Sequence, residues 1–529
     1  MDKSGPASTR PRPPFHPPLA FYIMLNALSL RLRGSSARAT GSESAPATDL
    51  TPPHQPSSSN ELVTLSASGE VGAVAASNAS SVLAMASVRA GEPPASSTNR
   101  TPLELVAVAD VSGSMSGEKM TLMKEALSFV VKQGLQAGDS FGLVTFASEV
   151  DVELKVTSMD VAGKKQAQRM IDGLHTKGQT NLSGGLLQGL DLLAGRSKAA
   201  GTGAARAVTR SVILFTDGMA NVGITETGHV VAAAHQALPA IDGGCSIFTF
   251  GFGSSHNEDM LRALSEVSPG GQYFFTKTAE EIPVAFADAL GGLVSVVAQN
   301  VELRIAPGAP GVRVERLLGA DGYAHELAPD GSALLIKLGD LYAEDEKDLL
   351  VSLHIPAIGD EDAHDEARPQ LALSLRYFDV SSTAYATVDT TLALARPKEA
   401  PTTQEPNEAL EVQRHRVHTA EALDRASKMA DAGELEAGRA LLNQIKKEVA
   451  CSPVAASKEH SKTCEQLVLE LETISEKYES RAAYESEGRF NSKMACQTHM
   501  VQRSAMGSGA VYEKKSKLRM KEAWRTSAH

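Results

Sequence analysis

Apolar and polar residues follow two different repeats along this chain, and the pattern changes at about residues 100 and 297. Between these points, nearly continuous apolar runs such as 103–109 and 211–216 alternate with segments of helical spacing such as 118–133. Short apolar runs typify strands buried on both faces of a sheet. The alternation predicts an α/β domain with a doubly wound, mostly parallel sheet. Further strands are predicted at 140–146, 150–156, 246–251 and 272–275, and helices at 159–174, 182–193, 226–240, 258–266 and 279–297.

Short strand-like runs flank this region on both sides. Residues 62–65 and 82–88 precede it, and runs separated by turn residues continue from 301 to 394. Both sets have the composition of strands bounded by Gly, Pro, Asp and Ser. We therefore expect a β-sandwich that receives strands from both sides, with the α/β domain inserted in it or followed by it.

Helical periodicity returns near the C-terminus. Residues 412–432 and 435–449 predict an antiparallel helix pair, and 462–478 a third helix. The resulting domain prediction is a disordered Pro- and Ser-rich N-terminus (1–60), sandwich strands (61–99), the α/β domain (100–297), the remaining sandwich (298–397), a helical region (405–484) and a loosely ordered tail (488–529).

Composition narrows the functional classes. The 529 residues carry a net charge of -12, which argues against a nucleic-acid partner. The basic cluster at 514–525 is interpreted as a solvated tail. The four cysteines lack metal-site spacing, so free thiols are expected. The apolar stretch 19–30 is too short to span a bilayer, although it also fits a signal or transit peptide.

Three polar loops of the predicted sheet contain the candidate functional residues. Residues 110–114 and 215–218 follow apolar strands, and 177–181 precede a helix. In a doubly wound sheet such loops meet at the carboxyl ends of the strands. They contain no His or Cys, and their oxygen ligands suit a hard cation, Mg²⁺ or Mn²⁺. The candidate ligands are the carboxylates of Asp110 and Asp217 and the hydroxyls of Ser112, Ser114 and Thr180.

Charge arithmetic indicates what such a site would do. Two carboxylates against a divalent cation leave no net charge to spare. If the carboxylates reach the cation through water and the hydroxyls bind directly, the cation stays electrophilic. A carboxylate from outside the chain can then complete the shell.

These loops resemble a known family. Asp-Val-Ser-Gly-Ser at 110–114, Gly-x-Thr-Asn at 178–181 and Thr-Asp-Gly at 216–218 resemble, in order, the metal-ion-dependent adhesion site of von Willebrand factor type A domains. The resemblance covers about residues 100–297. It implies that the serines and Thr180 are direct or switchable ligands and that the aspartates act directly or through water. It also implies that Thr180 could switch its ligation and move the helix at 279–297.

The chain also resembles a narrower group of intracellular plant and protist proteins in which strands and helices follow this domain. Some members carry a RING finger and act as ubiquitin ligases, but the ligands of that finger are absent from this sequence. We therefore expect no enzyme. The function predicted is a cytoplasmic, metal-dependent interaction module or scaffold that binds an acidic residue of a protein partner.

Three alternatives stay open. The metal could be structural, with binding through the sandwich or the helices. A Mg²⁺-dependent hydrolase would need a nucleophilic aspartate beside the metal, with a general acid and a lysine nearby. Ser112 stands where a second Asp would be expected. Finally, the loops could merely cap helices, because Ser, Asp and Thr are good N-cap residues.

Overall fold

The computed structural model describes residues 62–92, 100–199, 208–401, 404–505 and 512–527. The predicted disordered N-terminus and the apolar stretch at 19–30 lie outside these ranges. Within the described ranges, no helix is both long and apolar enough to cross a membrane.

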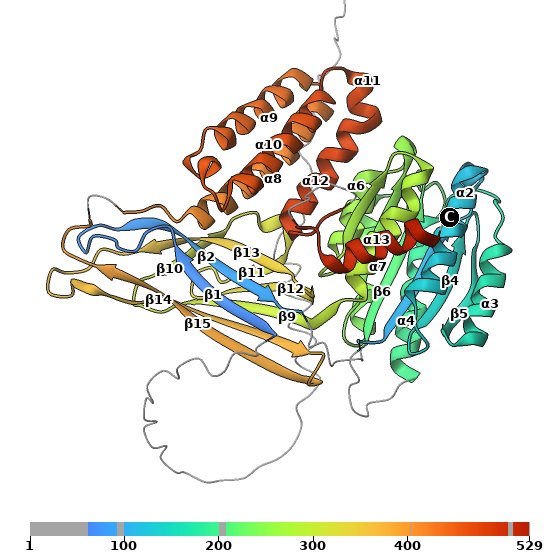
Figure 1. The fold of residues 1–529 in the computed structure, drawn as a ribbon, viewed down its shortest axis with the longest axis horizontal. Helices are drawn as coiled ribbons and strands as arrows, with labels where there is room; N and C mark the ends of the chain where they lie inside the picture. Colours follow the sequence, from blue (N-terminus) through green and yellow to red (C-terminus); the bar gives the residue numbers. More distant parts are fainter. Residues whose placement is uncertain (1–61, 93–99, 200–207, 402–403, 506–511, 528–529) are drawn as a thin grey trace, which may run out of the picture. The chain divides into compact units, whose positions relative to one another are not determined.

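Six strands form the central sheet in Figure 1: β3 (Leu103–Asp110), β4 (Ser140–Phe146), β5 (Val150–Ser158), β6 (Thr209–Thr216), β7 (Ser246–Phe252) and β8 (Gln272–Thr276). Their order is β5-β4-β3-β6-β7-β8, and only β5 runs antiparallel to its neighbour. Every residue of β3, β4 and β7 is buried, whereas β5 is partly exposed at the edge. Burial on both faces explains the continuous apolar runs of the central strands.

The helices between its strands and directly after β8 pack against this sheet: α2 (Glu118–Phe129), α3 (Val161–Asp172), α4 (Leu182–Ala199), α5 (Thr227–Ala237), α6 (Glu258–Glu266) and α7 (Ile282–Leu293). Gly189 of α4 lies against Val108 and Val212, while Phe286 of α7 stacks on Phe215 at 4.1 Å between ring centroids. Val212 and Phe215 point to opposite faces because they are three residues apart in β6. Helices therefore cover both faces, as the sequence predicts. Residues 103–293 are called the α/β unit below.

Two antiparallel sheets occupy the region where a β-sandwich was predicted. The first contains β1 (Val63–Gly69), β2 (Ser80–Ala90), β13 (Glu346–Ile355) and β10 (Arg313–Leu317). The second contains β11 (Ala324–Leu327), β12 (Leu334–Tyr342), β9 (Val296–Pro307), β14 (His364–Asp379) and β15 (Ala384–Arg396). Side chains from both sheets form one hydrophobic cluster. Since β2 pairs with β13, the α/β unit is inserted between strands of one sheet.

The helical region begins with α8 (Glu408–Asp431), α9 (Leu435–Ala450) and α10 (Ser461–Glu476), close to the predicted bounds. α8 begins at the N-cap Asn407, whose side chain accepts a hydrogen bond from the Leu410 amide. The short α11 (Arg481–Ala483) follows. Within the described part of the chain, the four cysteines form no disulfide, and Cys451 is the exposed one.

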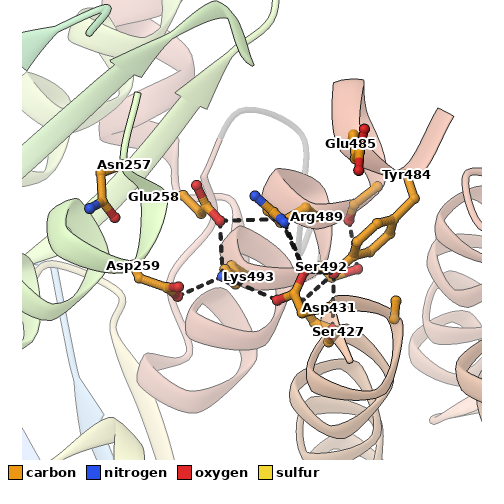
Figure 2. Close-up of polar contacts among 12 residues, drawn as sticks. Asn257, Glu258, Asp259, Ser427, Asp431, Tyr484, Glu485, Arg489, Ser492 and Lys493 are labelled. Atoms are coloured by element: carbon orange, nitrogen blue, oxygen red, sulfur yellow. Dashed lines mark hydrogen bonds and ion pairs between the residues drawn. The ribbon is translucent and has the colours of Figure 1, made fainter. Parts of the chain in front are cut away.

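The tail after residue 488 differs from the prediction, because it contains α12 (Arg489–Val501) and α13 (Lys515–Ser527). Every residue of α12 from Ser492 to Val501 is buried, so the helix has no polar stripe for a sequence pattern to reveal. Several of its polar side chains, among them Lys493 and Gln497, have partners in other elements instead. Figure 2 shows Lys493 between carboxylates of α6 and Asp431 of α8. Its Nζ is 3.0 Å from Glu258 Oε1 and 2.5 Å from Asp259 Oδ1.

The basic cluster at 514–525 is likewise only partly solvated, which corrects the prediction of a solvated tail. Lys517 and Lys521 are buried and pair with Asp288 of α7 at 3.4 and 3.1 Å. α13 contacts α7 over much of its length. Because the partner carboxylate lies more than 200 residues away in the sequence, charge patterning of the tail could not reveal it.

The predicted helix at 279–297 is also shorter in the structure. α7 ends at Leu293, and the chain enters β9 at Val296. Val296 pairs with Tyr342 of β12. Pairing with a distant strand has thus overridden the local helical periodicity.

Candidate metal centre

The first candidate loop follows β3 directly. Asp110, the last residue of the strand, is buried; its Oδ1 accepts a hydrogen bond from the Ser112 amide at 2.7 Å. Its Oδ2 accepts one from the Thr216 hydroxyl at 2.6 Å. The Oγ atoms of Ser112 and Ser114 lie 3.1 Å apart. The loop thus presents its serine hydroxyls beside a fixed carboxylate.

The third loop follows β6, the neighbour of β3 in the sheet. Asp217 is buried, and its Oδ1 accepts a hydrogen bond from the Ser114 hydroxyl at 2.7 Å. Its Oδ2 accepts one from Lys119 Nζ at 2.5 Å. Parallel neighbours end at the same edge of the sheet, which is why loops more than 100 residues apart in the sequence meet here.

The second loop completes the arrangement. The Gly178 carbonyl accepts a hydrogen bond from the Gly113 amide at 3.2 Å, which ties this loop to the first one. The Thr180 amide donates to Asn221 Oδ1 at 2.8 Å, which ties it to the segment after β6. A Cβ on Gly218 would lie 3.6 Å from Ser114 Oγ and 3.7 Å from Thr180 Oγ1. Both hydroxyls therefore border the small space beside Gly218.

All five residues predicted from the sequence are thus brought together at the carboxyl edge of β3 and β6. Capping alone does not account for them, because the Ser112 side chain makes no cap hydrogen bond. Asn181 does act as a cap, since its Oδ1 accepts a hydrogen bond from the Gly184 amide at the start of α4. The capping interpretation holds for Asn181 and not for Ser112.

Burial sets the electrostatics of the loops. It raises the pKa of Asp110 to about 6, while hydrogen bonds from Ser112 and Thr216 lower it and the charge of Asp217 raises it further. Two buried carboxylates so close together favour a positive counter-charge.

The donor set fits a hard divalent cation. Two carboxylates and three hydroxyls supply only oxygen, as Mg²⁺ or Mn²⁺ requires, and they leave room for water in the shell. Among the described residues, no group of three His, Cys, Asp or Glu side chains could hold a metal. A cation at these loops would therefore depend on Ser112, Ser114 and Thr180 as well as on the two aspartates.

Sequence reasoning missed the role of Lys119 at this site. Its side chain reaches Asp217 from the first turn of α2, 98 residues away in the sequence. The spacing of Lys119 from the first loop carries no recognisable signal, because the contact depends on how α2 packs beside the sheet.

Comparisons with known proteins agree with this geometry. The family model of the von Willebrand factor type A domain matches residues 104–287. The E3 ubiquitin-protein ligase WAV3 of Arabidopsis thaliana is 28% identical over 277 residues, which are 49% of this chain and 32% of that protein. Inter-alpha-trypsin inhibitor heavy chain H1 of Mesocricetus auratus is 33% identical over 168 residues, 31% of this chain and 18% of that protein. The chain thus spans a third or less of these relatives.

A solved structure supports the fold beyond the α/β unit. The von Willebrand factor type A protein from Catenulispora acidiphila has a TM-score of 0.58 at 16% sequence identity. The match covers 76% of this chain and 88% of that chain. At this identity the likeness concerns the fold alone, and it includes residues outside the 104–287 match because it covers more of the chain.

Proposed function

We propose, from the premise that residues 104–287 form a von Willebrand factor type A domain, that this domain binds a protein partner through a divalent cation. The observation that carries the proposal is the convergence of the five predicted ligands from three loops at one edge of the sheet. Ser112, Ser114 and Thr180 would hold the cation directly. Asp110 and Asp217 would hold it directly or through water.

The cation, when bound, would offer a coordination position to a carboxylate of the partner. The chain's own residues would orient that contact. Asp110 is fixed by the Ser112 amide and the Thr216 hydroxyl, and Asp217 by Ser114 and Lys119. Such fixed groups reduce the ordering cost of binding.

Apolar side chains beside the site favour a protein as the partner. Met219 and Ile224, in the segment that follows Asp217, are 54% and 37% exposed. Exposed large apolar side chains next to a polar anchor resemble the composition of protein interfaces. We therefore propose an acidic residue flanked by apolar residues as the recognised element.

The proposal concerns binding without catalysis. The ligase activity in the name of the plant relative belongs to a protein of which this chain matches 32%. Our proposal for this chain is an interaction module or scaffold.

Calorimetric titration of chelator-treated protein with Mg²⁺ and Mn²⁺ tests the proposal. We expect saturable binding by the wild type and its loss in Asp110→Ala. Asp172→Ala, which removes an exposed carboxylate of α3, is the matched control and should bind as the wild type does. Wild-type protein that binds neither cation would contradict the proposal. Metal binding that raises Tm without any metal-dependent partner capture would instead favour a structural metal.

A further inference from the structure

Lys119 lies at the candidate metal centre without being one of its predicted ligands. Its Nζ is 2.5 Å from Asp217 Oδ2, and its side chain is 36% exposed while that of Asp217 is 1% exposed. The other oxygen of Asp217 accepts the Ser114 hydroxyl. Asp217 therefore already has a positive partner on one side and a hydroxyl donor on the other.

The packing of α2 fixes this position. Met115, Met120 and Met123 are buried beneath the start of the helix, and Gly117 at its N-cap has a φ of 84°. A positive φ is readily adopted by glycine, which lets the chain turn sharply from the first loop into α2. Lys119 thus lies on the side of α2 that faces the candidate site, and the buried methionines hold this end of the helix in place.

Lys119 changes the net charge of the site when a cation is bound. Asp110 and Asp217 contribute two negative charges, which equal the charge of one divalent cation. Such a site has no net positive charge with which to attract an anionic partner. Lys119 adds one positive charge directly on Asp217, so the loaded site carries a surplus of one.

We propose that Lys119 is the specificity-determining residue of this site: it lowers the affinity for the cation and raises the affinity of the loaded site for a monoanionic carboxylate. This inference rests on the proposed function and names a residue that tunes it. Because like charges repel, the ammonium of Lys119 disfavours binding of the cation. The same positive charge attracts the carboxylate of a partner. The two affinities are therefore expected to move in opposite directions when Lys119 is neutralised.

The test uses the full chain with Mn²⁺ and acetate as probes. The affinity for Mn²⁺ is measured from the paramagnetic resonance signal of the free ion. The affinity of the Mn²⁺-loaded protein for acetate is measured from the relaxation of water protons, which changes when acetate displaces water from the ion. For Lys119→Met we expect roughly tenfold tighter Mn²⁺ binding and acetate binding weakened by roughly the same factor.

Two controls isolate the charge. Lys119→Arg keeps it and should leave both affinities within about twofold of the wild type. Lys124→Met removes an ammonium from the same helix that donates to the Asp172 carbonyl instead. It should also behave as the wild type.

Unchanged affinities in Lys119→Met, or affinities that move in the same direction, would overturn this inference while leaving the proposed function in place. Failure of the wild type to bind Mn²⁺ would overturn the proposed function and this inference with it. Thermal melting of each variant without cation shows whether the fold is intact, and a Lys119→Met protein that melts as the wild type does makes either result decisive.

Discussion

Two lysine–carboxylate clusters that include a carboxylate of the α/β unit differ in their access to water. At the candidate metal centre, Lys119 pairs with Asp217, and the lysine side chain is 36% exposed. At α7, Lys517 and Lys521 pair with Asp288, and the exposed fractions of all three side chains are 10% or less. Water near Lys119 lets its ammonium move at small cost, whereas a buried ammonium has no solvent to replace its partner. The first pair can therefore take part in binding, and the second can only hold the structure.

Further contacts of α13 reinforce this difference. The chain's single tryptophan, Trp524, packs edge-on against Phe129 of α2 at 5.1 Å between ring centroids. Gly291 of α7 lies so close to α13 that a Cβ there would be 2.7 Å from Lys517 Cα. Burial lowers the pKa of Lys517, and the charge of Asp288 opposes that shift. α13 is thus fastened to both α7 and α2.

Removing the carboxylate of the buried cluster should have the largest effect. Asp288→Ala removes the carboxylate that two buried ammonium groups share, which leaves Lys517 with the Ser504 carbonyl and Lys521 with Glu513. This loss should lower the free energy of unfolding by roughly 3–5 kcal/mol. Urea denaturation measures the change. Asp172→Ala, an exposed control, should stay within about 0.5 kcal/mol of the wild type. If Asp288→Ala lowered the free energy of unfolding by less than about 1 kcal/mol, the two clusters would not differ in their contribution to stability.

His256 extends the comparison to a buried basic side chain whose hydrogen-bond partner is not a carboxylate. Its ring is hydrogen-bonded to the Tyr273 hydroxyl at 2.6 Å. Burial lowers the pKa of His256 to about 4. The folded state therefore disfavours the charged ring, and stability that is complete above about pH 6.5 is lost as pH falls toward 4. Relative to His256→Gln, the wild type should lose roughly 2–3 kcal/mol of unfolding free energy over this range. Urea denaturation at several pH values measures it.

The exposed His235 provides the control for that experiment. His235→Gln should keep the acid dependence of the wild type. Identical pH profiles for the wild type and His256→Gln would show that the buried ring does not resist protonation.

A side chain at Gly291 should loosen α13 with a smaller cost. Gly291→Ala places a methyl group against the backbone of Lys517, which should lower the free energy of unfolding by roughly 1–3 kcal/mol. The emission of Trp524 should shift to longer wavelength as it leaves Phe129. Gly195→Ala is the matched control, because a Cβ there meets nothing within 4 Å. An unshifted emission maximum in Gly291→Ala would count against close docking of α13.

The Lys119–Asp217 pair, in which the lysine is partly exposed, should show the smallest effect on stability. Without cation, Lys119→Met should change the free energy of unfolding by about 1 kcal/mol or less, since solvent at the partly exposed lysine screens the pair. Urea denaturation in a chelating buffer measures this. A loss as large as that of Asp288→Ala would mean that Lys119 has a structural role.

The three candidate loops could be predicted because each one is contiguous in the sequence, and two of them follow strands whose burial is evident from their own apolar residues. Asp110 and Asp217 meet as soon as the strand order is known. Thr180 is placed instead by hydrogen bonds that join its loop to the other two. The central sheet was predictable for the same reason. Burial on both faces leaves runs such as Leu103–Asp110 almost entirely apolar.

The remaining features depend on contacts between distant segments. α12 was missed because it is enclosed on all sides: Gln497, for example, accepts a hydrogen bond from the Tyr273 amide and donates to Ser265 Oγ. Its polar residues therefore resemble an exposed segment in the sequence. The burial of Lys517 depends on Asp288, and the role of Lys119 on Asp217. Composition and periodicity describe only the residues near a given position in the sequence. The partners of Lys517 and Lys119 are distant in the sequence, so these patterns do not reveal them.

The insertion of the α/β unit between β2 and β13 has a consequence for synthesis on the ribosome. Ser87 of β2 bonds to Asp348 of β13, 261 residues later. At typical rates of roughly 5–20 residues per second, β2 waits roughly 13–52 s for this partner. The α/β unit is complete by residue 293 and can fold during that wait. A nascent chain stalled after residue 340 should therefore contain a protease-resistant α/β unit and a protease-sensitive β2.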